Sequence, residues 1–421
     1  MPILLGAIAD DLTGATDLAN TLARTGMRTV LVPGVHSRLE CAGDADAVVI
    51  ALKSRSVAAD LAVRMSLEAL DALRALHPRQ YYFKYCSTFD STDSGNIGPV
   101  AEALLTALET DLTIFCPSFP ENGRTVYKGH LFVQDRLLSE SGMENHPLNP
   151  MRDPNLVRVL QRQSVSEVGL LPFAEVRQGA AAICAALERL RGQGIRLVIM
   201  DALSDRDLMA IGEAVGSMQL ITGGSALARG LANHFRRLGV LSEAGRDEPL
   251  PPVFGPAAII SGSCSVMTNA QVAEFRKNHP VFDIDPIRIH AGEDQVRAAL
   301  AWAMERVENE VVLISATASP DRVSRARQVV GEVAGSLVES TLARISAGLL
   351  ELGVRRLVVA GGETSGAVID ALGIQTLRIG QQIAPGVPWT VSSGTPAIAL
   401  ALKSGNFGSP TFFETAFNIR P

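Results

Sequence analysis

The sequence predicts an α/β protein with two domains, each a mainly parallel sheet flanked by helices. Short apolar runs alternate with helical patterns along most of the chain, which is typical of strands and helices in parallel α/β sheets. A chain of 421 residues is longer than one hydrophobic core usually organises. Nearly half of the residues are apolar and only 5% are aromatic, a composition that suits helices packed on parallel strands.

The first half supplies most of these elements. Apolar runs bounded by turn residues predict strands at residues 3–9, 29–32, 47–51, 81–84, 113–116, 168–171 and 196–200. Helical periodicity predicts helices at residues 13–25, 58–76, 96–108, 176–191 and 205–215. Residues 120–154 are rich in Pro, Asn, Gly and His and show little periodicity, so we expect an irregular loop there, with a function.

The second half repeats the alternation after a polar and then proline-rich stretch at residues 242–252. Such a stretch is typical of a linker and predicts one domain at 1–245 and another at 253–421. Strands are expected at residues 257–260, 311–315 and 357–360. Residues 320–352 form one long helical pattern with a break near Gly331 or Gly335.

Charge and cysteine content exclude several classes of protein. The formal charge is −6, which lacks the basic footprint of a nucleic-acid-binding protein. The cysteines form no C-x-x-C pair, which favours reduced thiols and a cytoplasmic location. They are Cys41, Cys86, Cys116, Cys184 and Cys264. The N-terminal apolar run lacks a basic region and soon reaches two acids, so we expect neither a signal peptide nor a membrane span.

The stretch ADDLTGA, residues 9–15, directly follows the first predicted strand. Asp10 and Asp11 would therefore lie at the carboxyl edge of a parallel sheet, where α/β proteins bind ligands. Asp11 or Thr13 could instead cap the following helix. Capping needs only one such residue, so the second acid favours a functional role.

Two further stretches place polar residues at the same edge. Residues 84–96, KYCSTFDSTDSGN, combine Lys84, several hydroxyls and Asp90, which could bind a carboxylate and a polyol together. The alternative is a turn rich in Ser and Asp that caps a helix. In LKSRS, residues 52–56, Arg55 could grip a substrate carboxylate or could equally be a solvated surface arginine.

Small-residue turns between strands and helices recur at residues 221–225, 261–265 and 361–366, and KSGNFG follows at 403–408. Backbone N–H groups at a helix start can bind anions, so the turns of the second half could wall a nucleotide pocket. Tight packing is the alternative explanation for any single turn. The loop around His130 could close over a substrate, although a lone His is weak support. The chain shows no H-E-x-x-H, G-x-S-x-G or Walker A motif, and we expect no P-loop.

Taken in order, ADDLTGA, KYCSTFDST, GGETSG and KSGNFG resemble the four-carbon acid sugar kinases over essentially the whole chain. The stretches FKYCSTFDSTDSGNIGP, CPSFPENGRTVYKGHLFV and ESGMENHPLNPMRDPN are most similar to the 3-oxo-tetronate 4-kinase branch of that family. The resemblance implies a two-domain kinase without a P-loop. Its N-terminal domain would bind the acid sugar and its C-terminal domain would bind ATP.

The resemblance also implies which residues form the two sites. Substrate contacts are expected from Asp10, Asp11, Arg55, Lys84, Ser87, Asp90 and Ser91. Nucleotide contacts are expected from Ser263, Gly361, Gly362, Glu363, Thr364 and Gly405. Mg²⁺ would bridge the ATP phosphates, and the sequence assigns no metal ligand because phosphate and water often hold this ion.

The implied reaction moves the γ-phosphoryl group of ATP to the C4 hydroxyl of 3-oxo-tetronate, giving 3-oxo-tetronate 4-phosphate. Either Asp11 or Asp90 would orient and deprotonate that hydroxyl, and the sequence does not choose between them. Arg55 and Lys84 would hold the substrate carboxylate. The linker would let the domains close and exclude water.

Other functions stay open at this point. The substrate could be D-threonate or D-erythronate. An NAD(P)-dependent enzyme ranks low, because no G-x-G-x-x-G follows the first strand. A non-catalytic small-molecule sensor with two lobes would bind the ligand without consuming ATP. The expected partners are a small acid sugar and ATP, not nucleic acid or membrane, and the sequence leaves open whether the chain forms a homo-oligomer.

Overall fold

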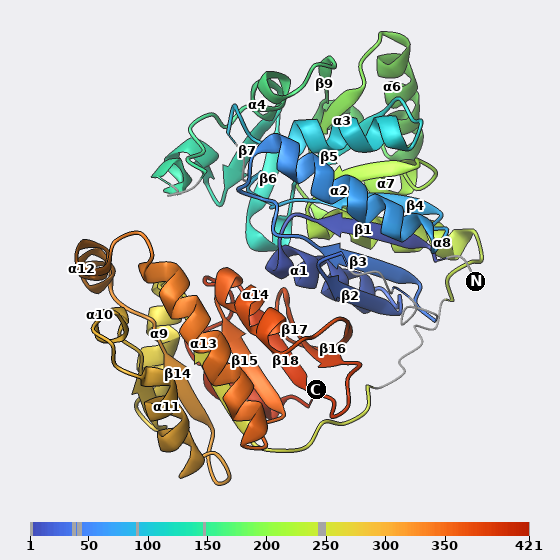
Figure 1. Cartoon of the computed structure of the whole chain (residues 1–421). Coiled ribbons are helices and arrows are strands. Elements are labelled where there is room, and N and C mark those ends of the chain that lie inside the picture. Colours follow the sequence, from blue (N-terminus) through green and yellow to red (C-terminus); the bar gives the residue numbers. More distant parts are fainter. Residues whose placement is uncertain are drawn as a thin grey trace. The chain divides into compact units, whose positions relative to one another are not determined.

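A computed structural model of the chain describes residues 3–35, 39, 44–89, 92–145, 149–242 and 250–420. The chain divides into two compact units, Met1–Asp247 and Glu248–Pro421. Each unit is built on strands that carry helices (Figure 1), which confirms the predicted α/β class. Of the predicted linker at 242–252, residues 243–249 lie outside the described residues.

The strands of the first unit's main sheet are all parallel and run in the order β2-β3-β1-β4-β11-β5-β10-β9. Several are uninterrupted apolar runs rich in Val and Ile that are fully buried, as expected for a parallel sheet covered on both faces. Their bounds are β1 (Leu5–Ala9), β2 (Thr29–Pro33), β3 (Ala47–Ala51), β4 (Gln80–Lys84), β5 (Thr113–Cys116), β9 (Val168–Leu171), β10 (Leu197–Met200) and β11 (Leu220–Gly223).

Helices of the first unit pack on this sheet in two groups. One core cluster joins Ile8 and Phe83 of the strands to Leu70 of α2 and Leu104 of α3. Buried Leu18 of α1 lies outside that cluster, and α1 packs with α8, which in turn packs with α7. The helices are α1 (Leu12–Arg24), α2 (Ala59–Arg74), α3 (Ile97–Ala107), α4 (Leu156–Gln163), α5 (Phe173–Val176), α6 (Ala180–Gly192), α7 (Asp205–Ala214) and α8 (Ala228–Arg237), with 3-10 turns η2 (Pro120–Asn122), η3 (Leu138–Glu140), η4 (Met143–Asn145) and η5 (Ser225–Leu227).

The second unit's strands run in the order β13-β14-β12-β15-β18-β17-β16. Pairing is parallel from β13 to β18 and antiparallel between β18, β17 and β16. The strands are β12 (Ala257–Ser261), β13 (Val281–Asp283), β14 (Val312–Ser315), β15 (Arg356–Ala360), β16 (Leu377–Ala384), β17 (Val387–Ser392) and β18 (Ala399–Lys403). The helices are α9 (Val266–Phe275), α10 (Pro286–His290), α11 (Gln295–Met304), α12 (Pro320–Val330), α13 (Ala334–Glu351), α14 (Gly362–Ala371) and α15 (Phe412–Thr415), followed by the 3-10 turn η6 (Ala416–Asn418).

The irregular loop expected at residues 120–154 is a partly wrong prediction. That segment contains a small antiparallel sheet of β6 (Arg124–Tyr127), β7 (His130–Val133) and β8 (Arg136–Leu137). Its first turn is held by a distant residue, because Asp201 accepts the backbone N–H groups of Lys128 and Gly129 at 2.7 and 2.8 Å. Residues 146–148 lie outside the described residues.

Two helix predictions need correction. The helix expected at 176–191 is interrupted, because Gly179 adopts a φ of 95° and the long helix α6 begins only after it. The pattern at 320–352 is two helices, α12 and α13, which are bent by 103°. Of the two candidate breakpoints, Gly331 is the one at the break, with a φ of 84°.

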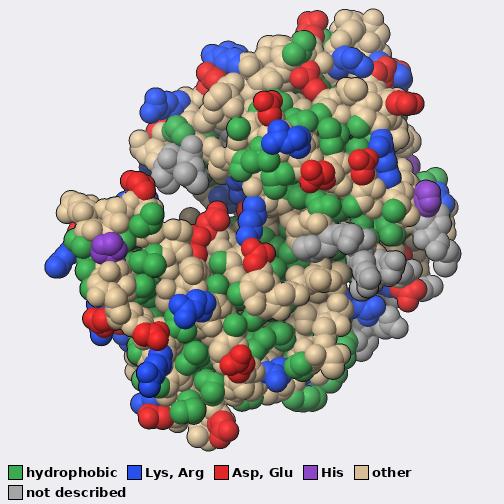
Figure 2. Space-filling model, viewed as in Figure 1, with side chains coloured by type: hydrophobic (Ala, Val, Ile, Leu, Met, Phe, Trp, Pro, Cys, Tyr) green, Lys and Arg blue, Asp and Glu red, His purple; other side chains and the backbone are tan. Residues whose placement is uncertain are grey.

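The surface charges, the helices and the cysteines bear on the classes of protein that the composition excluded. On the face shown in Figure 2, basic and acidic side chains are interspersed without a large field of one sign. No single described helix is long and apolar enough to cross a membrane, although α12 and α13 pass that test as a bent pair. Four cysteines are free thiols, and Cys41 lies outside the described residues.

Candidate functional site

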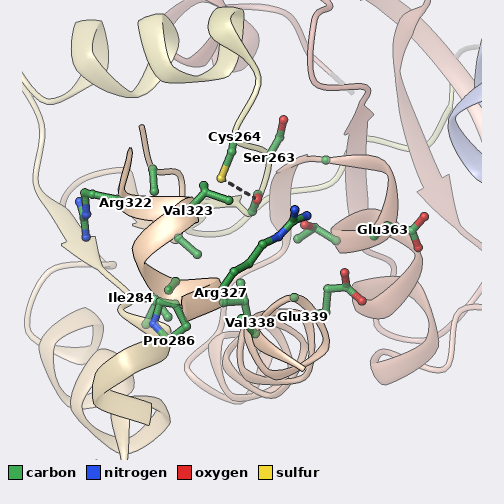
Figure 3. A pocket seen from close by; sticks show the side chains of 18 of the residues that line it. Ser263, Cys264, Ile284, Pro286, Arg322, Val323, Arg327, Val338, Glu339 and Glu363 are labelled. Atoms are coloured by element: carbon green, nitrogen blue, oxygen red, sulfur yellow. Dashed lines mark hydrogen bonds between the residues drawn. The ribbon is translucent and has the colours of Figure 1, made fainter. Parts of the chain in front are cut away.

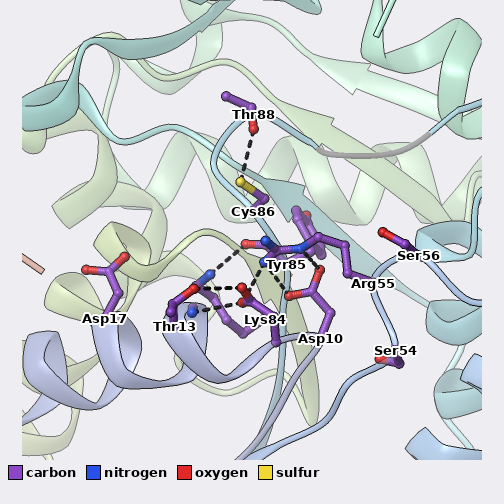
Figure 4. A network of polar contacts seen from close by, with 12 residues as sticks. Asp10, Thr13, Asp17, Ser54, Arg55, Ser56, Lys84, Tyr85, Cys86 and Thr88 are labelled. Carbon is purple, nitrogen blue, oxygen red and sulfur yellow. Dashed lines mark hydrogen bonds and ion pairs between the residues drawn. The ribbon is translucent and has the colours of Figure 1, made fainter. Parts of the chain in front are cut away.

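Charged side chains gather where neighbouring strands of the first unit end (Figure 4). In the parallel register, Ala9 at the end of β1 lies beside Ala51 of β3 and Lys84 of β4. Asp10 and Asp11 therefore leave the sheet at the same edge as Lys84, and Arg55 follows shortly after β3. Parallel α/β sheets bind ligands at this edge.

Arg55 joins the two acids. Its Nε donates to Asp10 Oδ2 at 2.9 Å, and its Nη2 donates to Asp10 Oδ1 at 2.8 Å and to Asp11 Oδ1 at 2.6 Å. Asp10 is buried, and the Arg55 side chain is 21% exposed. This forked contact fixes the plane of the guanidinium. Arg55 Nη1 has no hydrogen-bond partner among the described residues, so it can still bind an anion.

The two acids respond differently to the same cation. Burial raises the pKa of Asp10, and the Arg55 charge offsets burial only in part. Burial also acts on Asp11, but the charges of Arg55 and Lys84 outweigh it and lower the pKa of Asp11. Asp11 caps α1 by accepting the Gly14 N–H at 2.8 Å, and its other oxygen accepts the Thr13 hydroxyl at 2.8 Å. Both oxygens of Asp11 are thus engaged.

Lys84 approaches the start of α1 closely. It is buried, and its ammonium donates to the Tyr85 carbonyl at 2.8 Å. A Cβ at Gly14 would lie 3.0 Å from Lys84 Nζ and 2.3 Å from Asp11 Oδ1, so a side chain at this position of ADDLTGA would have to displace the Asp11 carboxylate. Lys84 forms no ion pair among the described residues, which leaves ammonium hydrogens available to a ligand.

The remaining predicted substrate residues follow β4. Ser87 is half-buried in a turn near Lys84 in the sequence. Asp90 and Ser91 lie outside the described residues. The structure therefore brings Asp10, Asp11, Arg55 and Lys84 together, and these four form the unit-1 charge cluster.

Asp17 is a polar residue of this edge that the sequence interpretation missed. It is buried on α1 and accepts the Ser225 hydroxyl at 2.5 Å, and burial raises the pKa of Asp17. Asp17 follows Thr13 by four residues, or about one helical turn, and this spacing indicates that the two residues lie on the same face of α1. Ser225 belongs to the turn at 221–225, whose glycines are required for packing, since a Cβ at Gly224 would lie 2.7 Å from the Pro117 carbonyl.

The second unit has a cavity of about 540 Å³ at the carboxyl ends of β12, β14 and β15 (Figure 3). Ser263 and all four residues from Gly361 to Thr364 line it, as the sequence predicted for one pocket. Gly362 and the next residues form the first turn of α14, so their backbone N–H groups have no partner within the helix. Such a turn can bind phosphate oxygens.

Close approach of two backbone turns explains the glycines here. A Cβ at Gly262 would lie 2.2 Å from Thr364 Oγ1, and one at Gly361 would lie 2.8 Å from the same oxygen. Gly361 also has a φ of 128°, a conformation that strongly favours glycine. Both glycines are needed to bring Ser263 and Thr364 to the same wall.

Gly405 lies behind this wall and does not line the cavity. A Cβ on Gly405 would lie 2.6 Å from Ser263 Oγ. Its carbonyl accepts hydrogen bonds from Lys403 Nζ at 2.9 Å, Ser265 Oγ at 2.7 Å and Thr268 Oγ1 at 2.8 Å. Gly405 is therefore placed to support the Ser263 turn from below.

Most of the opposite wall was not identified from the sequence. It consists of apolar and charged residues from the start of α10 and the two residues before it, from α12 and α13, and from the turn between these helices, namely Ile284, Asp285, Pro286, Ile287, Arg322, Val323, Arg325, Ala326, Arg327, Glu332, Ala334, Gly335, Val338 and Glu339. No local motif marks these residues, because their common direction depends on how the two helices fold back.

Comparison with known proteins decides the family. A model of a sugar-binding N-terminal domain matches residues 5–231, and a model of a nucleotide-binding C-terminal domain matches residues 258–413. Proteins named 3-oxo-tetronate kinase from Cupriavidus necator and Burkholderia multivorans are 57% and 56% identical to this chain, over 98% of it and 96% of each relative. The chain belongs to the 3-oxo-tetronate kinase family.

Other members of this kinase family are similarly complete matches. The 3-oxo-tetronate kinase of Salmonella typhimurium is 45% identical over 98% of both chains. A crystal structure of a Salmonella typhimurium protein, 44% identical, aligns over 98% of both chains with a TM-score of 0.88. A Haemophilus influenzae protein of 41% identity aligns over 98% of this chain and 99% of its own, with a TM-score of 0.81. These matches confirm the resemblance that the ordered motifs indicated.

Proposed function

We propose that this chain transfers the γ-phosphoryl group of Mg-ATP to the C4 hydroxyl of 3-oxo-tetronate and releases 3-oxo-tetronate 4-phosphate and ADP. The observation that carries the proposal is the full-length membership in a family of kinases with that name. The two sites support it, because one is a cluster of charges suited to a small acid and the other is a glycine-walled cavity suited to phosphates. The first unit would then be the acid-sugar domain and the second the nucleotide domain.

The unit-1 charge cluster would bind the substrate through its cations. Arg55 Nη1 and the ammonium of Lys84 would contact the substrate carboxylate, since both have hydrogens without a partner among the described residues. Asp10 would orient Arg55 through its two hydrogen bonds. Ser87 and Ser91 would bind the hydroxyl and oxo groups of the four-carbon chain.

The contacts and the lowered pKa of Asp11 guide our choice of the general base between Asp11 and Asp90. Its two oxygens are engaged by Arg55, Gly14 and Thr13, and its pKa is lowered, so it is a weak proton acceptor. We therefore assign the base to Asp90 and a supporting role to Asp11, which holds Arg55 and the start of α1.

The nucleotide would occupy the second unit's cavity. Ser263 and the Gly361–Thr364 turn would bind the phosphates, and Gly405 would support Ser263. The cavity fits Mg²⁺ bound with ATP, because Glu339, Glu363 and the Thr364 hydroxyl supply oxygen ligands at its wall. No group of three or more His, Cys, Asp or Glu among the described residues could hold a metal by itself, so phosphate and water would complete the coordination. We place the reaction in the cytoplasm, where ATP is available.

The test is ADP release from Mg-ATP with 3-oxo-tetronate, D-threonate, D-erythronate and a hexose. Turnover confined to the oxo acid would support the proposal. Turnover on threonate or erythronate would keep the kinase and change the substrate. Ligand binding without ADP release from any acid would support a sensor and contradict the proposal.

The assignment of the base has its own test. Asp90→Asn should lower kcat by at least about a hundredfold and leave the ATP affinity within about twofold, because a general base acts on the chemical step. Asp11→Asn should mainly raise KM for the acid sugar, through loss of its contacts to Arg55. The reverse pattern, with kcat lost only in Asp11→Asn, would return the base role to Asp11.

A further inference from the structure

Arg327 occupies a distinctive place in the second unit's cavity. It comes from the last turn of α12, and in Figure 3 its side chain crosses the cavity so that the guanidinium lies toward Ser263 and Glu363. Arg322 of the same helix lines the cavity as well, but its guanidinium lies at the opposite side of the view, away from Glu363. Two arginines of one helix thus have different directions relative to the glycine-walled turn.

The guanidinium of Arg327 has no acidic partner among residues 250–420. Other arginines of this unit do have such partners: Arg276 binds Asp283 at 2.6 Å, and Arg288 binds Glu293 at 2.6 Å. Arg355 instead donates to backbone carbonyls at 2.7 and 2.8 Å. A cation that extends across a cavity and lacks a carboxylate partner keeps its full capacity to bind an anion.

The cavity has two chemically different ends. Ile284 and Pro286 lie at the side of the cavity away from Glu363 in Figure 3, and Val323 and Val338 add apolar surface between that side and the polar lining of Ser263 and the Gly361–Thr364 turn. The backbone of Arg327 belongs to the apolar wall, and its side chain spans the distance to the polar end (Figure 3). An elongated ligand with an apolar ring at one end and negative charge at the other matches this division.

We infer that Arg327 binds the phosphate chain of the nucleotide and that the base lies against Ile284, Pro286, Val323 and Val338. This inference rests on the proposed function, because it takes the ligand to be ATP. The guanidinium fork would contact phosphate oxygens from the side opposite the Gly361–Thr364 turn. Arg327 thereby supplies the positive charge that a Walker A lysine supplies in P-loop proteins, from a helix that carries no nucleotide-binding motif.

The bend between α12 and α13 makes this placement feasible. The helices meet at 103° with Gly331 at the break, and Arg327 lies one turn before the break with its carbonyl accepting the Gly331 N–H at 2.9 Å. Val338 lies one turn after the start of α13 and lines the same cavity. The bend therefore directs residues from both helices into one site.

Titration with a fluorescent N-methylanthraniloyl ATP tests the inference. Arg327→Ala should weaken ATP binding about tenfold or more, because it removes charge-assisted hydrogen bonds to phosphate. The affinity for adenosine, measured by displacement of the probe, should change by less than about twofold, and Arg327→Lys should restore part of the ATP affinity. Arg297→Ala is the control, because Arg297 is exposed on α11 and does not line the cavity, and it should leave ATP binding within about twofold of the unaltered chain.

The outcomes separate this inference from the proposed function. If the unaltered chain binds ATP and Arg327→Ala binds it equally well, the inference is overturned and the kinase proposal stands. Equal losses for ATP and adenosine would also overturn it, since Arg327 would then only shape the cavity. If the unaltered chain does not bind ATP at all, the proposed function itself fails. Arg327 is exposed, so each variant should fold, and a thermal melt checks this.

Discussion

Two buried lysines occupy corresponding places in the two units and differ in how their charge is compensated. Lys84 is the last residue of β4 and donates to the carbonyl of the next residue, Tyr85, at 2.8 Å. Lys403 is the last residue of β18 and donates to the carbonyl of Ser404 at 3.0 Å. Both side chains are buried. In both units, therefore, the carbonyl of the residue after the strand accepts a hydrogen bond from the buried lysine.

The two lysines differ in the charge of the groups that surround them. Lys84 lies near enough to Asp10, Asp11 and Asp17 to affect the pKa of each carboxyl. Among the described residues, the Lys403 ammonium donates to the neutral oxygens of Thr268, Ser404 and Gly405, and burial lowers the pKa of Lys403 to about 7. The comparison shows that burial among neutral oxygens lowers the pKa of the strand-end lysine Lys403. In the second unit the charge depends on pH.

The largest expected effect is the pH dependence of stability caused by Lys403. Its pKa is near 7 in the folded chain and near 10.5 when unfolded, so between these values the unfolded chain binds more protons. The free energy of unfolding should therefore rise as pH increases from 7 toward 10, by at most ~5 kcal/mol. Urea unfolding of the chain and of Lys403→Met across this range measures the difference.

The variant Lys403→Met should lack this rise, so the difference between the two proteins should shrink or change sign at high pH. A constant difference from pH 7 to 10 would mean that the three oxygen acceptors keep Lys403 charged in the folded chain. The contrast between the two lysines would then be lost.

The second effect concerns Lys84. Lys84→Met should lower the free energy of unfolding at pH 7 by about 3 kcal/mol, because buried carboxylates lose a nearby positive charge. Urea unfolding measures it. Lys277→Met is the control, since exposed Lys277 follows the end of α9 and pairs with Glu274 of that helix, and its loss should cost less than about 0.5 kcal/mol. A loss no larger than that of the control would show that Arg55 alone compensates the acids.

The smallest expected effect follows from adding a Cβ where the turn at Gly262 lies close to Thr364. Gly262→Ala places a Cβ against Thr364 and should cost about 2 kcal/mol of stability. It should also reduce ATP affinity and leave acid-sugar affinity unchanged, as measured by calorimetry. Gly192→Ala is the control, because a Cβ there meets no atom within 4 Å. Reduced affinity for the acid sugar would contradict the separate sensitivities of the two sites.

Most strands of the first unit's main sheet, and polar residues at its carboxyl edge, could be predicted from the sequence. Residues 47–51 and 113–116 are continuous buried runs, and their predicted bounds equal those of β3 and β5. Asp10 and Lys84 come directly at strand ends, so the parallel topology alone brings them together. These features were predictable because each depends on a few consecutive residues.

The remaining features depend on contacts between distant parts of the chain. The hairpin of β6 and β7 has strands of four residues and is fixed by Asp201, far along the sequence. In the sequence, Arg327 is an ordinary arginine of a helical pattern. Its place in the cavity depends on the 103° bend after α12, which no local motif predicts. Asp17 needed a partner, Ser225, that no local pattern connects to it.

The shared contacts of Arg55 also constrain how this site can evolve. Arg55 and its two acids come from separate segments. Loss of Arg55 removes the ion-pair partner of both carboxylates, and loss of either acid removes one of the two ion pairs of Arg55. A single substitution that changes specificity should therefore cost more stability within the cluster than at an uncharged neighbour in the sequence such as Ser87, which is half-buried. Divergence among acid sugar kinases should then begin with such uncharged residues, while the cluster is inherited as one unit.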